Sequence, residues 1–155
     1  MQTRREWLRL AGGALMVGVP ALTRAQASAD NTLEVWKSPS CGCCGLWVAH
    51  MQQNGFTATV RDLNDVSPIK RKFGVPQALA SCHTAVVNGV ALEGHVPADV
   101  VRQLQKQRTT HAHVVGLAVP GMPIGSPGME QGSRQDKYDV IAFDKRGLTS
   151  VFASR

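Results

Sequence analysis

Short apolar stretches and amphipathic stretches alternate along the first half of the chain. Leu33 to Trp36 and Thr57 to Leu63 are rich in β-forming residues and predict two strands. Between them, apolar residues recur at helical spacing over residues 46–51, and Gly55 stands where a helix stop is expected. A serine followed by a proline then predicts the start of a short helix over residues 67–73. The first half therefore reads strand, helix, strand, helix.

The next segment contains a hairpin signal. Thr84 to Val87 and Val90 to Leu92 are apolar β-formers, and Asn88-Gly89 between them is typical of a two-residue hairpin turn. Pro97 to about Gln107 follows as a helix with apolar residues on one face. This order of elements resembles a thioredoxin-like fold. We therefore predict an α/β protein with a single thioredoxin-like domain, whose four-stranded sheet is flanked by helices.

The pattern changes after Arg108. Residues 119–130 hold three prolines and three glycines in twelve positions, which excludes a regular helix or a central strand. Tyr138 to Phe143 and Leu148 to Ala153 then predict a closing hairpin. We expect a C-terminal Pro/Gly/Met loop over residues 119–130, below called the Pro/Gly loop, and a hairpin that holds this loop against the domain.

The first 27 residues have the order of a signal peptide. Basic residues precede a mildly apolar stretch from Ala11 to Leu22, and Ala25-Gln26-Ala27 supplies a small-residue cleavage site. The stretch has twelve residues, three of them glycines, whereas a membrane span needs roughly 20 apolar residues. Arg4-Arg5 resembles a twin-arginine signal, and a plain secretory signal is the alternative. We predict a signal peptide over 1–27, a domain over 28–155, and a periplasmic protein without a membrane span.

Charge and length set limits on the function. The chain of 155 residues has the size of one domain. Its net charge is +6, and half of this excess lies in the first 27 residues. The dense basic cluster Lys70-Arg71-Lys72 is interpreted as the solvated face of a short helix. We therefore predict no nucleic-acid partner.

The cysteines carry the candidate chemistry. Cys41, Cys43 and Cys44 fall within four residues, and Cys82 lies in the connector before the hairpin. Adjacent cysteines do not readily pair, and a Cys41–Cys43 ring would be small and strained. The easiest pair is therefore Cys41 with Cys44, at the spacing of thiol oxidoreductases. A helix that begins just after Cys41 favours thiolates, which are both nucleophiles and ligands of soft metals.

The extra sulfurs favour metal binding. An oxidoreductase needs one attacking and one resolving cysteine, whereas Cys43 and Cys82 bring the number of thiolates to four. Thiolates select Cu(I), zinc or iron–sulfur clusters. Zinc could use four cysteines, or three of them with His83, but a second closely spaced ligand pair is missing. The familiar ferredoxin spacings are also absent. We predict one or more Cu(I) ions.

Three further residues are candidate ligands. His83 occupies the position that faces the redox cysteines in thioredoxin-like folds, although it could equally be a satisfied or exposed histidine. Met122 and Met129 lie in the Pro/Gly loop, where little other apolar content explains them by packing, and a thioether is a Cu(I) ligand. His111-Ala112-His113 is either a surface Cu(II) or zinc pair or an exposed loop. His50 and His95 are given no role in the site.

Several motifs resemble those of one family. They are Ser40–Cys44, Ser81–Ala85, Glu93–Pro97, Gly116–Pro123 and Gly125–Glu130, which together resemble the CopG copper-resistance family over nearly all of residues 28–155. The resemblance implies a periplasmic thioredoxin-like protein that holds a cluster of copper ions and contributes to copper tolerance, with copper redox chemistry as a further function. It points to Cys41, Cys43, Cys44 and Cys82, and less directly to His83, Met122 and Met129.

The expected function is therefore capture of copper ions in the periplasm, alongside other copper-handling proteins. The sequence leaves open whether the chain is also an enzyme. Two alternatives remain at this point. One is a thiol–disulfide oxidoreductase that uses Cys41 as nucleophile and Cys44 as resolver. The other is a structural or interaction protein stabilised by zinc.

Overall fold

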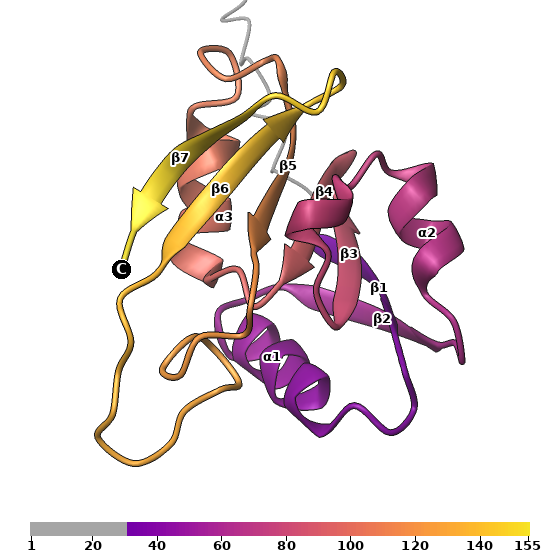
Figure 1. Cartoon of the computed structure of the whole chain (residues 1–155), viewed down its shortest axis with the longest axis vertical. Helices are drawn as coiled ribbons and strands as arrows, with labels where there is room; N and C mark the ends of the chain where they lie inside the picture. The colour runs from indigo at the N-terminus through magenta and orange to yellow at the C-terminus, as the bar shows by residue number, and fades with distance from the viewer. Residues whose placement is uncertain (1–30) are drawn as a thin grey trace, which may run out of the picture.

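The computed structural model describes residues 31–155 as a mixed α/β fold with one sheet and three α-helices (Figure 1). The predicted signal peptide over residues 1–27 lies outside the described residues. The elements in chain order are β1 (Thr32–Lys37), α1 (Gly42–Gln53), β2 (Thr57–Asp62), α2 (Ser67–Lys72), the 3₁₀ turn η1 (Gln77–Leu79), β3 (His83–Val87), β4 (Val90–Gly94), α3 (Ala98–Lys106), β5 (Val114–Val119), β6 (Asp139–Asp144) and β7 (Thr149–Ser154). Within residues 31–155, no helix has the length and apolar character that a bilayer span needs.

The sheet has seven strands in the order β2-β1-β3-β4-β5-β6-β7, so the predicted four-stranded sheet is wrong. The four expected strands form one side of it, with β1–β2 parallel and β1–β3 and β3–β4 antiparallel. The difference arises at β5, a strand that the sequence pattern does not predict. It pairs parallel to β4 and antiparallel to β6, so the closing hairpin extends the same sheet.

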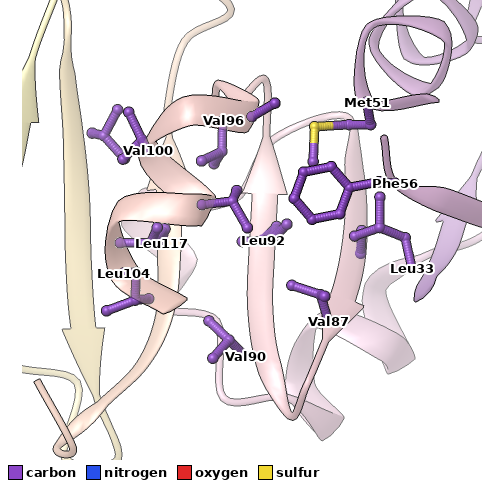
Figure 2. Close-up of a cluster of buried hydrophobic side chains, with 14 of the residues drawn as sticks. Leu33, Met51, Phe56, Val87, Val90, Leu92, Val96, Val100, Leu104 and Leu117 are labelled. Atoms are coloured by element: carbon purple, nitrogen blue, oxygen red, sulfur yellow. The ribbon is translucent and has the colours of Figure 1, made fainter. Parts of the chain in front are cut away.

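Alternation along the strands divides the apolar side chains between two clusters. Val90 and Leu92 of β4 lie in the main core, whereas Ala91 between them lies in a smaller one. The main core also receives side chains from α1 and α3, which therefore cover the same face of the sheet. Figure 2 shows these side chains converging from α3, the strands and the end of α1. The smaller cluster packs Leu79 of η1 and Phe143 of β6.

This arrangement brings three segments to one end of the sheet. The connection from β1 into α1 carries the first cysteines, and the hairpin β3–β4 has its open end nearby. The Pro/Gly-rich segment that leaves β5 runs beside α1 (Figure 1), and its Gly128 lies directly against the backbone of that helix. The candidate site lies where these three segments meet.

Candidate metal centre

The first three cysteines lie at the beginning of α1. Cys41 is the N-cap residue, with an extended backbone, and its N–H donates to the carbonyl of Ser38 at 3.1 Å. Cys43 and Cys44 lie in the first helical turn. No acidic side chain occupies this first turn. The sulfurs are therefore placed near free backbone amides and the positive end of the helix dipole, as the sequence predicts.

Cys41 and Cys44 are joined by a disulfide, with their Cα atoms 5.4 Å apart. The pair that the spacing identifies as easiest to close is therefore confirmed. Cys43 and Cys82 are free, and the Cys43 sulfur lies 3.6 Å from that of Cys41. All four sulfurs lie within 4.8 Å of one another, although Cys82 is far away in the sequence. Disulfide sulfurs are not thiolates, so a four-thiolate set forms once this bond is reduced.

Cys82 reaches this point because of the hairpin. The two-residue turn pairs Val87 with Val90 and Thr84 with Glu93. The same register, continued past the end of the ladder, sets Cys82 opposite His95. The Cys82 sulfur lies 3.2 Å from His95 Nε2 and 3.3 Å from His83 Nδ1. A second group of potential ligands thus consists of Cys82, His83 and His95.

His95 is a residue that the sequence interpretation missed. It is fully buried, and its Nδ1 lies 2.7 Å from the carbonyl oxygen of Pro127 in the Pro/Gly loop. Because a carbonyl only accepts hydrogen bonds, Nδ1 carries the proton and Nε2 presents a lone pair toward the Cys82 sulfur. Burial lowers the pKa of the imidazole, which favours this neutral form. The sequence does contain a signal for His95. The two-residue Asn-Gly turn fixes which residues of the hairpin lie opposite one another, and it thereby sets His95 opposite Cys82.

His83 is fully buried at the start of β3, as expected for a residue that faces the cysteines. Its ring packs at a tilt of 45° against that of Trp47 in α1, with 4.4 Å between centroids, and meets the His95 ring edge-on at 5.2 Å. Burial lowers the pKa of its imidazole to about 3, and the neighbouring His95 adds to the effect. Within the described part of the chain, its Nε2 has no hydrogen-bond partner. The neutral ring therefore keeps one buried polar atom unsatisfied.

A buried carboxylate fixes the segment that carries Cys82. Glu93 of β4 is fully buried and accepts hydrogen bonds from the Ser81 N–H at 2.5 Å and the Thr84 hydroxyl at 2.7 Å. Lys70 of α2 pairs with it at 2.5 Å. Burial raises the pKa of the Glu93 carboxyl, while Lys70 opposes that shift. The network ties the residue before Cys82 to the opposite strand.

The Pro/Gly loop closes over the beginning of α1. Gly128 has a φ of +85°, and a Cβ there would lie 2.7 Å from the Trp47 nitrogen and 2.8 Å from the Cys43 oxygen. Glycine is therefore required by both conformation and space. Met129 of this loop is half-buried, whereas Met122 is 41% exposed in a left-handed conformation. The role of both thioethers as ligands stays a prediction.

The other histidine pair lies elsewhere. His111 and His113 precede β5, at the end of that strand opposite to the Pro/Gly loop, with their rings 6.3 Å apart. His111 packs edge-on against Phe152 of β7 at 5.2 Å. His50, in α1, accepts a hydrogen bond from the Ala98 N–H at 3.3 Å, in agreement with a structural role.

Alkylation of Cys82 in the metal-free, disulfide-closed protein is expected to be slow at neutral pH. Burial, together with the neighbouring Cys43, raises the pKa of its thiol to about 11. The labelling rate should therefore rise about tenfold per pH unit up to that value. Mass spectrometry after timed iodoacetamide treatment measures the rate at Cys82, with the Cys82→Ser chain as control. Rapid labelling at pH 7 that does not change with pH would contradict the expectation.

Comparisons with known proteins give three results. A family model described as a protein of unknown function, DUF411, matches residues 79–129, which include Cys82, His83, His95 and Met129. Two solved structures of copper resistance protein copG, forms 1 and 2, are similar at 44% identity and a TM-score of 0.75. The similarity covers 80% of this chain and 96–97% of those chains. Among curated proteins no match is found.

Proposed function

The chain belongs to the CopG family of copper resistance proteins, and from this premise we propose that it binds one or more Cu(I) ions in the periplasm through Cys41, Cys43, Cys44 and Cys82. Capture of the ion lowers free copper and so contributes to copper tolerance. The proposal includes export by a cleaved twin-arginine signal peptide over residues 1–27. It also includes exchange of copper with other periplasmic copper-handling proteins.

One observation carries the proposal, namely the convergence of four sulfurs within 4.8 Å from two distant segments. A thiol–disulfide enzyme uses two of them, so Cys43 and Cys82 need another explanation. Thiolates are soft ligands that favour Cu(I), and one thiolate can bridge two ions. We further propose that the fold is related to thioredoxin, because a strand leads directly into a helix that begins with Cys41-Gly42-Cys43-Cys44.

The four-thiolate site requires reduction of the disulfide. Two electrons and two protons from a dithiol reductant break the Cys41–Cys44 bond and give two thiols, while the reductant becomes a disulfide. Cu(I) then displaces the thiol protons as it binds. The raised pKa of Cys82 keeps that proton in place until the ion arrives. His83, Met122 and Met129 are proposed as additional ligands.

The closed disulfide also favours a second candidate function. A reducible Cys41–Cys44 bond at the beginning of a helix is the arrangement of a thiol–disulfide oxidoreductase, with Cys41 as nucleophile. Such an enzyme would keep its disulfide-reducing activity in Cys43→Ser and Cys82→Ser variants. The copper-binding function requires both residues, so the two candidates make opposite predictions for the same variants.

Cu(I) titration of the reduced protein under anaerobic conditions tests the proposal. We expect more than one Cu(I) per chain, and a lower stoichiometry in both Cys43→Ser and Cys82→Ser, because each change removes one sulfur from the cluster. Competition with a Cu(I) chelator gives the stoichiometry, and His113→Ala is the control expected to match the parent. A protein that binds no copper but reduces disulfides without Cys43 and Cys82 would be an oxidoreductase instead.

A further inference from the structure

We propose that Cys82, His83 and His95 form a second metal site, which accepts a divalent cation of the zinc type while Cys41 and Cys44 are disulfide-bonded. This site shares Cys82, and the proposed additional ligand His83, with the copper site described above. It uses neither cysteine of the disulfide, so it does not depend on the Cu(I) function.

The spacing of the three donor groups already suits one ion. With metal–sulfur and metal–nitrogen bonds of about 2.3 and 2.0 Å, a tetrahedral centre places sulfur and nitrogen ligands about 3.5 Å apart. The Cys82 sulfur lies 3.3 Å from His83 Nδ1 and 3.2 Å from His95 Nε2. One ligand atom from each of the three residues lies within 4.8 Å of the others. Small side-chain adjustments are therefore enough to enclose an ion.

His95 is oriented as a metal ligand. Its Nδ1–H donates to the Pro127 carbonyl at 2.7 Å, which leaves the Nε2 lone pair directed at the shared position beside Cys82. Histidines that bind metals usually donate their other ring N–H to a carbonyl or carboxylate, because this bond fixes both the tautomer and the ring orientation. The Pro/Gly loop supplies this support before any ion is present.

His83 provides an independent observation. The ring is fully buried, and within residues 31–155 its Nε2 has no hydrogen-bond partner. Burial of an unsatisfied polar atom costs roughly 1–3 kcal/mol, which an apolar residue of similar size would avoid. The nitrogen that faces the site is Nδ1, 3.3 Å from the Cys82 sulfur, so an ion would bind Nδ1 and leave Nε2 unpaired. A buried histidine that bears this cost indicates that its Nδ1 serves beside Cys82 as a ligand, rather than the ring as a packing group.

The mixed donor set determines which ion fits. Two neutral imidazoles and one thiolate suit zinc and other divalent ions of intermediate softness, in contrast to the four-cysteine set that favours Cu(I). Three protein ligands leave a fourth tetrahedral position for water or an exogenous ligand. Unless its thiolate bridges two ions, Cys82 can belong to only one of the two sites at a time. When the Cys41–Cys44 pair is reduced, Cys82 joins the four-cysteine copper site. When the pair is disulfide-bonded, Cys82 binds a divalent ion together with His83 and His95.

Cobalt(II), a spectroscopic substitute for zinc, tests the proposal in the oxidised chain. The Cys43→Ser protein with its disulfide closed has Cys82 as the remaining free thiol. We expect one Co(II) per chain, with a thiolate-to-cobalt charge-transfer band and the visible bands of a tetrahedral ion. An added Cys82→Ser change should abolish the charge-transfer band, and an added His95→Ala change should weaken binding at least tenfold.

The control is His113→Ala, which removes an exposed histidine just before β5, at the end of that strand opposite to the Pro/Gly loop, and should leave the cobalt titration unchanged. Circular dichroism establishes whether each variant is folded. If His95→Ala unfolds the protein, Cys82→Ser still tests the site, because serine is nearly isosteric with cysteine. Absence of cobalt binding by the folded oxidised protein, or a band that persists without Cys82, overturns the second site. Failure of the Cu(I) titration alone would overturn the proposed function and leave this site intact.

Discussion

Replacing Glu93 by alanine is expected to lower the free energy of unfolding by about 3–5 kcal/mol, as is typical when one partner of a buried ion pair is removed. The change leaves the Lys70 ammonium, whose side chain is 12% exposed, without its carboxylate at 2.5 Å. It also removes the acceptor of the Ser81 N–H and of the Thr84 hydroxyl. Urea denaturation of the metal-free, disulfide-closed protein at pH 7 measures the loss.

The matched control is Glu34→Ala. Glu34 of β1 pairs with Arg61 at 3.9 Å, and both side chains are more than half exposed, so its loss should cost less than about 1 kcal/mol. Glu93→Gln keeps the side-chain length but directs an amide donor toward a cation, and should fall between the two. Equal losses for the Glu93→Ala and Glu34→Ala variants would show that the buried network does not stabilise the fold.

Glu93 is also expected to position Cys82. Burial raises the pKa of its carboxyl, so ionisation of Glu93 is unfavourable in the folded state and by itself lowers stability above the ordinary pKa of the group. The hydrogen bonds from Lys70, Ser81 and Thr84 to the carboxylate offset this destabilisation. They also fix the backbone at Ser81. Faster alkylation of Cys82 in Glu93→Gln than in the parent would show that this constraint reaches the thiol.

Local sequence pattern was sufficient to predict most helices and strands. Alternation, helical spacing and the Asn-Gly turn gave α1, α3 and the hairpin β3–β4, because each of these depends on neighbours in the sequence. The strand β5 was missed because Gly116 interrupts a short apolar run beside a Pro/Gly-rich segment. Gly116 is explained by tertiary structure, since a Cβ there would collide with the ring of Phe143 in β6. Without β5, the closing hairpin had no sheet to join.

The candidate site was predictable in part. The closure of Cys41 with Cys44 follows from their spacing, and the position of His83 follows from the resemblance to a thioredoxin-like order of elements. His95 could also have been found, because the two-residue turn sets it opposite Cys82. Its hydrogen bond to Pro127 could not, because that contact joins residues 32 positions apart through the packing of an irregular loop.

Replacing Gly128 by alanine is expected to detach this loop from α1. The residue has a φ of +85°, which costs a non-glycine residue about 1–2 kcal/mol. The new Cβ would also lie 2.7 Å from the backbone nitrogen of Trp47, and overpacking of this kind costs about 1–3 kcal/mol. Because the obstructing atoms belong to a helix backbone, they cannot rotate away. We therefore expect the loop, rather than the helix, to move.

Hydrogen exchange gives a local measure of this detachment. The Met129 N–H, which donates to the Ser126 carbonyl at 2.8 Å, should lose protection by a factor of about 30 to several thousand, corresponding to 2–5 kcal/mol. Gly121→Ala is the control, because Gly121 has a φ of +77° in the same loop but open space around its Cβ position. Its effect should be confined to the smaller conformational cost.

The Gly128→Ala change should also affect the second metal site. Since Pro127 would move together with residue 128, this variant should release His95 and weaken cobalt binding there. Unchanged protection in Gly128→Ala would show that the close approach to α1 does not hold the loop.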